Sequence, residues 1–108
     1  YVTVSDDPNV LSPRKHFGQI IGAPGVLHRT TAIYDYFKKL DATSPFVSME
    51  PVGTSEEGRP MHLVIIGNED AQKRLDHYKK QLARLADPRT VQPGELEKIL
   101  GDTKLVYY

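Results

Sequence analysis

Apolar side chains recur at helical spacing in the stretch Thr31–Leu40. Residues three or four positions apart lie on one face of a helix, so this spacing predicts an amphipathic helix. Thr30 or Thr31 is suited to cap its start, and Ser44-Pro45 is suited to end the connection that follows. The positions of the stripe are Ile33, Tyr36, Phe37 and Leu40.

Two further helices are predicted in the second half of the chain. The range Ala71–Ala86 carries an apolar stripe, Asn68 before it is a good N-cap, and Asp87-Pro88 ends it. Pro93 suits the first turn of a short third helix, and Gly101 is expected to stop that helix in the left-handed conformation. The stripes consist of Leu75, Tyr78, Leu82 and Leu85 in the longer helix, and of Leu96, Ile99 and Leu100 in the shorter one.

Two short apolar runs flank a polar turn. In Phe46–Val52 apolar and polar residues alternate, which is typical of a half-buried strand, and Pro51 indicates a sheet edge or a strand end. Met61–Ile66 is apolar at nearly every position, which suits a strand covered on both faces. The turn Thr54–Pro60 joins the two runs, so the pattern predicts a β-hairpin.

The ends of the chain complete the expected fold. Residues 1–30 are rich in proline and glycine with little periodicity, which predicts an extended N-terminal arm. Lys104–Tyr108 is apolar and predicts the start of a third strand. The order helix, hairpin, two helices and strand favours an α/β fold over residues 31–108, with a mixed sheet flanked by two to three helices.

Composition narrows the class of protein. Apolar residues make up 39% of the chain and charged residues 26%, which excludes a disordered polyelectrolyte. No apolar run approaches the roughly 18 residues of a membrane span. The 14 Lys and Arg balance the 14 Asp and Glu, so the basic excess of a nucleic-acid binder is absent. There is no cysteine. Because the chain begins at Tyr1 without Met, we expect a processed chain from a secreted or periplasmic protein.

The four histidines do not form a metal-binding motif. None of them shows the close spacing on a helix or strand that brings two ligands together. His62 alternates with apolar residues in the second strand and is expected to be a hydrogen-bonded structural residue. His77 is expected at the surface of a charged helix, and His16 and His28 flank the arm. We therefore assign no catalytic, cofactor-binding or metal-binding residue within this chain.

Two groups of charged residues have competing interpretations. The long helix is locally basic, which suits either a phosphate-binding face or a solvated face with acidic residues interspersed. The zero net charge favours the solvated face. Glu56 and Glu57 are adjacent, but on a turn their side chains are expected to diverge into solvent. No glycine-rich phosphate loop or Gly-x-Ser-x-Gly motif occurs. The basic residues are Lys73, Arg74, Lys79, Lys80, Arg84 and Arg89.

The hairpin segment Gly53–Met61 resembles the first hairpin of the zinc metallocarboxypeptidases, the carboxypeptidase A-like family. Its most specific part is Glu57-Gly58-Arg59-Pro60. Other segments resemble a bacterial branch of this family in the same order, from about Ser12 to Tyr108. These are Phe17-Gly18, Tyr36-Phe37-Lys38-Lys39-Leu40, Thr43-Ser44-Pro45, Ile65-Ile66, Asn68-Glu69, Arg74-Leu75-Asp76, Leu85-Ala86-Asp87-Pro88-Arg89 and Lys104–Tyr108.

The resemblance implies the N-terminal segment of a hydrolase that removes C-terminal residues from peptides with one zinc ion. In this family a His-x-x-Glu pair and a later His hold the metal, a distant Glu is the general base, and an Arg holds the substrate carboxylate. Three protein ligands leave a position for water, whose pKa the zinc lowers. All these residues would lie beyond Tyr108. Arg59 matches the hairpin arginine of the family and is expected to tether the turn.

The alternative is a non-catalytic α/β interaction module that is complete in itself. The two readings differ in what they predict for the sheet. As part of a larger domain the sheet would be incomplete and would expose apolar surface and strand edges, so we expect marginal stability or self-association. A complete module would have a closed and stable sheet.

Overall fold

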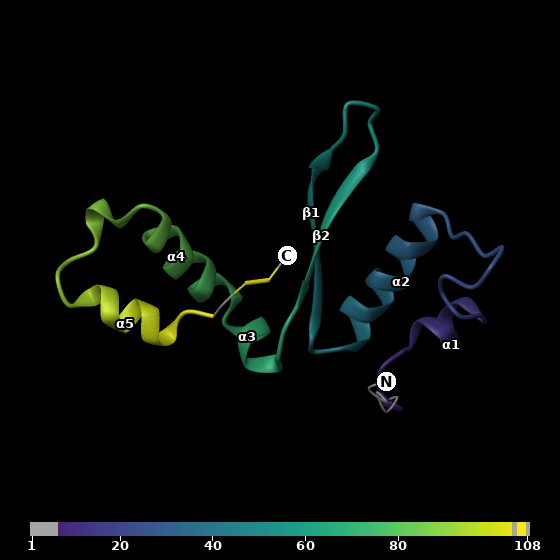
Figure 1. The fold of residues 1–108 in the computed structure, drawn as a ribbon, viewed down its shortest axis with the longest axis horizontal. Coiled ribbons are helices and arrows are strands. Elements are labelled where there is room, and N and C mark those ends of the chain that lie inside the picture. Colours follow the sequence, from purple (N-terminus) through teal and green to yellow (C-terminus); the bar gives the residue numbers. More distant parts are fainter. Residues whose placement is uncertain (1–6, 105, 108) are drawn as a thin grey trace. The chain divides into compact units, whose positions relative to one another are not determined.

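The computed structural model describes residues 7–104, 106 and 107. The chain divides into two compact units, Tyr1–Gly67 and Asn68–Tyr108. The described residues form helices and one two-stranded antiparallel sheet (Figure 1). This confirms the predicted α/β class.

The predicted hairpin is present in the first unit. Strand β1 (Val47–Thr54) pairs antiparallel with β2 (Pro60–Ile66), and Val47 lies opposite Ile66. The register shifts between Pro51 and Gly53, which places a β-bulge in β1. Both strands extend closer to the turn than the apolar runs alone predicted.

Helix α2 (Thr30–Thr43) packs against β1 and carries the core of the first unit. Tyr36 and Leu40 are its buried residues, as the stripe predicted, whereas Ile33 of the same stripe is 39% exposed. The helix continues to Thr43, beyond the predicted end at Leu40, and Ser44 is its C-cap. Neither threonine caps its start, because Thr30 is already the first helical residue and the preceding Arg29 makes no side-chain cap bond.

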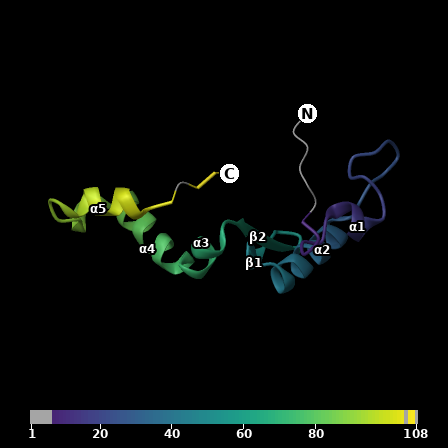
Figure 2. The ribbon, with the colours of Figure 1, turned by 90° about the horizontal axis from the view of Figure 1, so that it is seen from below.

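The N-terminal arm is not extended throughout, because it contains the short helix α1 (Pro13–Phe17). The Ser12 hydroxyl accepts a hydrogen bond from the Lys15 amide at 3.3 Å, and Gly18 closes the helix at φ 72°. A serine N-cap followed by proline at the first helical position is a sequence signal for a helix start. Figure 2 shows α1 beside α2, and the Phe17 ring lies 5.6 Å from that of Tyr36.

The second unit consists of α3 (Glu69–Lys73), α4 (Leu75–Ala86), the 3₁₀ helix η1 (Pro88–Thr90) and α5 (Glu95–Asp102). Asn68 caps α3 as predicted, since its Oδ1 accepts from the Ala71 amide at 2.8 Å. The single helix expected over residues 71–86 is wrong. The backbone leaves helical geometry at Arg74, with φ −106° and ψ 19°, and this residue separates α3 from α4.

Helix α5 differs from its prediction at both ends. It begins after Gly94, which has φ 88°, so Pro93 is not in its first turn. Gly101 lies inside the helix rather than stopping it. Only Ile99 of the expected apolar face is buried, whereas Leu96 and Leu100 are exposed. The physical reason is that α5 packs mainly on α4 among the described residues of this unit, so a single row of side chains is covered.

The predicted third strand is absent from the part of Lys104–Tyr108 that the structure describes. Lys104, Val106 and Tyr107 do not belong to a strand. Leu105 and Tyr108 lie outside the described residues. The two-stranded sheet is thus all that the described ranges show of the expected mixed sheet.

The second strand is not covered on both faces within the first unit. Met61, Leu63 and Ile66 remain 43%, 41% and 72% exposed. Helix α2 covers one side of the hairpin and mainly contacts β1, so β2 keeps apolar surface open. The expectation for an incomplete sheet, namely exposed apolar side chains, describes β2 in this unit correctly.

No helix within residues 7–104, 106 and 107 is long and apolar enough to cross a membrane.

Candidate functional site

The turn between the two strands is held together by its own backbone. The Ser55 amide donates to the Arg59 carbonyl at 2.8 Å, and the Gly58 amide donates to the Ser55 carbonyl at 2.9 Å. Ser55 also accepts through its hydroxyl from the Arg59 amide at 3.2 Å. Gly58 has φ 73°, in the left-handed region that favours glycine. The order serine, glycine, arginine therefore suits this turn.

Arg59 bonds within the same turn. Its Nη2 lies 2.8 Å from Oε2 of Glu57, and both side chains are largely exposed. Exposed pairs of this kind contribute little to stability because water screens them. The arrangement agrees with a tethering role for Arg59, and it gives Glu57 a partner rather than proton chemistry shared with Glu56.

The histidines are dispersed through the two units. His16 and His28 both lie against the Phe17 ring, at 4.6 and 4.3 Å between centroids, and His62 lies edge-on to Tyr34 at 4.7 Å. No group of three metal-binding side chains occurs among the residues that the structure describes.

The expected hydrogen bond of His62 is not found at its Nδ1. That nitrogen is buried and has no hydrogen-bond partner in the described part of the chain. The ring of Tyr34 packs against the His62 ring instead. The Tyr34 hydroxyl donates to the Pro60 carbonyl at 3.3 Å and not to His62. Alternation with apolar neighbours predicted the half-buried position of His62, but it cannot supply the partner.

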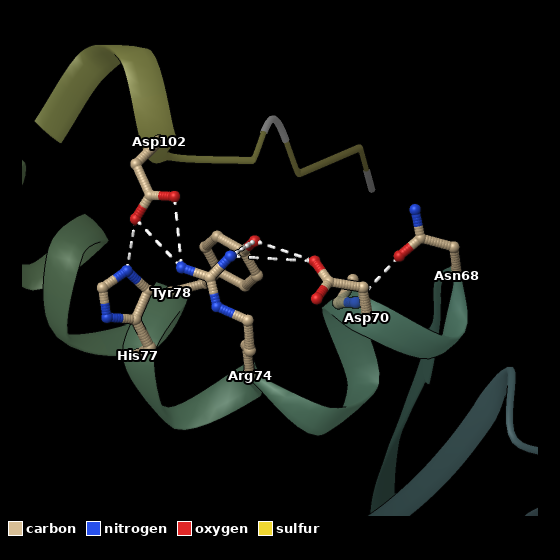
Figure 3. A network of polar contacts seen from close by, with 7 residues as sticks. Asn68, Asp70, Arg74, His77, Tyr78 and Asp102 are labelled. Carbon is tan, nitrogen blue, oxygen red and sulfur yellow. Dashed lines mark hydrogen bonds and ion pairs between the residues drawn. The ribbon is translucent and has the colours of Figure 1, made fainter. Parts of the chain in front are cut away.

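The densest polar contacts lie in the second unit and join α4 to α5 (Figure 3). Asp102, at the end of α5, contacts Nε2 of His77 through one carboxylate oxygen. Nη2 of Arg74 donates to both oxygens of the same carboxylate, at 3.2 and 3.3 Å. Arg74 therefore connects the α3–α4 break to the last residue of α5.

Tyr78 extends this network on the other side of Arg74. Nη1 of Arg74 donates to the Tyr78 hydroxyl at 3.1 Å, and its guanidinium carbon lies 5.0 Å from the ring centroid. The Tyr78 hydroxyl donates to Asp70 at 3.4 Å. We name the five residues Asp70, Arg74, His77, Tyr78 and Asp102 the α4–α5 network.

The charged groups of the network shift one another's pKa values in the directions expected for groups of opposite charge. The hydrogen bond with His77, followed by that with Arg74, lowers the pKa of the Asp102 carboxyl below its ordinary value. Conversely, hydrogen bonding to Asp102 raises the pKa of Arg74. Both oxygens of Asp102 are thus engaged by cationic or donating groups. The network is suited to fastening α5 to α4.

The basic residues of this region are mostly paired with carboxylates. Lys73 lies 2.6 Å from Glu69 and Arg84 lies 2.7 Å from Glu95. Arg89 lies 2.6 Å from Asp87, and this hydrogen bond lowers the pKa of the aspartate. The pairing supports the solvated-face interpretation of the basic helix over a phosphate-binding face.

A shallow hollow of about 290 Å³ lies along α4 and α5. Its walls carry the Arg84–Glu95 ion pair and the Asp102 carboxylate, with Ile99 at its base. Glu95 also accepts a hydrogen bond from the Gln92 amide at 3.0 Å. This backbone hydrogen bond is the main reason why the pKa of Glu95 is lowered, and Arg84 lowers it further. The side chains of Arg84, Glu95 and Asp102 in the hollow are therefore already partnered.

Sequence reasoning missed the α4–α5 network. Arg74 and His77 are three positions apart, so a shared helix face was a visible signal. Their partner Asp102 is 25 positions beyond His77, and no local pattern predicts that contact.

Comparisons with protein-family models, with curated proteins and with solved structures found no match for this chain.

Proposed function

We propose that this chain is the N-terminal segment of a zinc-dependent carboxypeptidase of the carboxypeptidase A-like family, which hydrolyses C-terminal residues from peptides. The observation that carries the proposal is the hairpin turn with its Glu57-Gly58-Arg59-Pro60 sequence. The turn connects two paired antiparallel strands, which supports the reading of this segment as a hairpin.

The geometry of the turn supports this reading more strongly than the sequence motif alone. Gly58 occupies a left-handed conformation, and Arg59 is engaged with Glu57 and with the backbone of Ser55. Each distinctive residue of the motif thus has a physical reason to be where it is. An unrelated occurrence of the same residues in a helix or an irregular loop would lack this fit.

The residues described in this chain do not provide the zinc site. His16, His28 and His62 lie in aromatic contacts and His77 pairs with Asp102. Among the described ranges no three ligand-type side chains converge on one point. We therefore place the ligands, the general base and the carboxylate-binding arginine outside these residues, and we derive no catalytic step here.

The experiment that tests the proposal is to read the encoding gene past Tyr108 and to assay the whole polypeptide. We expect a His-x-x-Glu pair within roughly a dozen residues, a later His, and one zinc ion per polypeptide by elemental analysis. Release of C-terminal residues from a peptide should stop when a chelator removes the zinc and return when zinc is added.

The matched control is the chain Tyr1–Tyr108 alone, for which we expect no hydrolysis. A whole polypeptide without these ligands would overturn the proposal. The non-catalytic interaction module, which requires no such ligands, would then be the remaining reading. The exposed apolar side chains of β2 are what the incomplete sheet of a larger domain predicts, and not what a closed module predicts. The same exposure underlies our inference that the chain alone tends to self-associate.

A further inference from the structure

The two edges of the hairpin differ in their capacity to accept another strand. The Gly67 amide donates to the Phe46 carbonyl directly opposite it, at 2.9 Å. Hydrogen-bonded and non-hydrogen-bonded pairs alternate along an antiparallel ladder. The backbone amide and carbonyl groups of Ser48 and Ile65 therefore point toward the partner strand. Those of the next residues along each strand point to the outer edges of the hairpin. The outward residues are Val47, Met49 and Pro51 on β1, and His62, Val64 and Ile66 on β2.

The outer edge of β1 is protected against pairing. Pro51 has no amide hydrogen to donate at an outward position. The bulge at Val52 bends the strand just beyond it, and Glu50 adds a charge. Proline, bulges and charges are the means by which natural sheet edges avoid pairing with another chain.

The outer edge of β2 has none of these protections. Its sequence, from Pro60 to Ile66, contains no Asp, Glu, Lys or Arg. His62, Val64 and Ile66 each present an amide and a carbonyl outward, and α2 lies mainly over β1. Among the described residues β2 pairs with β1 alone. Its side chains are also open, since Leu63 is 41% and Ile66 is 72% exposed.

We propose that β2 pairs antiparallel with β2 of a second copy of this chain. A two-fold axis at Val64 places Val64 opposite its own symmetry mate and His62 opposite Ile66 of the second copy. All three outward residues then exchange both backbone hydrogen bonds, whereas an axis at Leu63 would set Ile66 opposite Pro60, which has no amide hydrogen. The product is a four-stranded sheet with β1 at each protected edge.

The side chains of β2 are complementary to themselves in this register. On the face away from α2, Leu63 lies opposite Ile65 of the second copy, which gives an apolar cross-strand pair on each side of the axis. No charged residue of β2 meets another across the axis. A polar or acidic partner strand would forgo these apolar pairs, so a second copy is the occupant that the sequence of β2 favours. The inference concerns the chain Tyr1–Tyr108 by itself, because in the larger domain proposed above a further strand of that domain would occupy the same edge.

Two variants separate pairing at this edge from general adhesion of apolar surface. Ile66→Lys places a charge at an outward position of β2, and Val52→Lys places the same charge at the bulge of β1. Both side chains are more than half exposed, so the monomer should tolerate either change. Sedimentation velocity over a concentration series should show a dimer for the wild type. Ile66→Lys should raise the dissociation constant of the dimer by about tenfold or more. Val52→Lys should change the same constant by less than about threefold.

A cross-link tests the register, because the chain has no cysteine. Val64→Cys should form a disulfide-linked dimer under mild oxidation, since residues directly opposite each other have Cα atoms within disulfide reach. Val52→Cys should remain largely unlinked. A wild type that stays monomeric at all concentrations would overturn the proposal. Equal weakening by both lysine variants, or equal cross-linking of both cysteine variants, would overturn it as well.

Discussion

The Tyr36 hydroxyl donates a hydrogen bond to the Leu11 carbonyl at 2.9 Å, which fastens the N-terminal arm to α2 across 25 positions of sequence. The ring is 8% exposed, and burial raises the pKa of the hydroxyl, which therefore stays protonated and able to donate. The contact explains why residues before α2 belong to the first unit rather than to a detached arm.

Removing this hydroxyl should loosen the arm. Tyr36→Phe keeps the ring packing but leaves the Leu11 carbonyl without its donor, so we expect a loss of about 1 kcal/mol in the free energy of unfolding. Urea unfolding followed by circular dichroism measures it. Tyr34→Phe is the matched control, because that hydroxyl makes a longer and exposed bond to Pro60. Equal losses in the two variants would show that the Leu11 contact does not hold the arm.

The second unit depends on one side chain of α5 more than on its neighbours. Ile99 is 2% exposed, and it is the buried residue of this helix. Ile99→Ala should cost about 2–4 kcal/mol, because the lost burial is accompanied by a cavity. In so small a unit this is expected to abolish most of the helical signal of residues 68–108.

The adjacent Leu100 supplies the control for that prediction. It is 59% exposed, so Leu100→Ala should change the free energy of unfolding by less than about 0.5 kcal/mol. Helical content by circular dichroism and backbone amide protection by nuclear magnetic resonance distinguish the two variants. Comparable effects at both positions would mean that Leu100 is also covered in solution.

Local signals in the sequence predicted the elements better than their contacts. The hairpin, the core of α2 and the Asn68 cap follow from periodicity and capping chemistry, which act over a few residues. The break at Arg74 was not predictable in this way. It accompanies contacts with Asp102 on another helix, and such contacts are decided by the packing of the unit.

The same distinction applies to burial. The apolar sequence of β2 indicated a strand covered on both faces, but burial depends on which partners are present. In the described part of the first unit, α2 is the helix that packs on the hairpin, and it mainly contacts β1. Likewise, the spacing of Leu96 and Leu100 predicts an amphipathic helix, yet α5 packs mainly on α4, and both side chains stay exposed.

Two glycines should respond to alanine in opposite directions. Gly58 has φ 73°, whereas Gly101 has ordinary helical geometry, and at both positions an added Cβ would meet nothing within 4 Å. Gly58→Ala should therefore destabilise the first unit by about 1 kcal/mol through backbone strain alone. Gly101→Ala should stabilise α5 by about 0.5–1 kcal/mol, because alanine restricts the unfolded chain.

Urea midpoints of the two glycine variants against the wild type provide the measurement. The pair also tests the corrected position of Gly101. If Gly101 ended the helix in a left-handed conformation, as its place in the sequence suggested, alanine there would destabilise the chain as well. Destabilisation by both substitutions would therefore contradict the helical geometry described for α5.

Acid should release α5 from α4 through Asp102. Its pKa is lower in the folded chain than the ordinary value of 3.8, so the folded state binds this proton less readily than the unfolded state. The stability that Asp102 contributes is therefore complete above the ordinary value and is lost as the pH falls through the lower folded value. Asp102→Asn removes the charge at every pH, so the variant should have the lower thermal midpoint near pH 7, and its difference from the wild type should close as the pH falls through the lowered pKa of Asp102. Glu56→Gln, at an exposed position in the hairpin turn, is the control and should show no such difference at either pH.

A difference for Asp102→Asn that stays constant as the pH falls would mean that its carboxylate does not hold α5 through charge. The contacts with Arg74 and His77 would then act only as neutral hydrogen bonds.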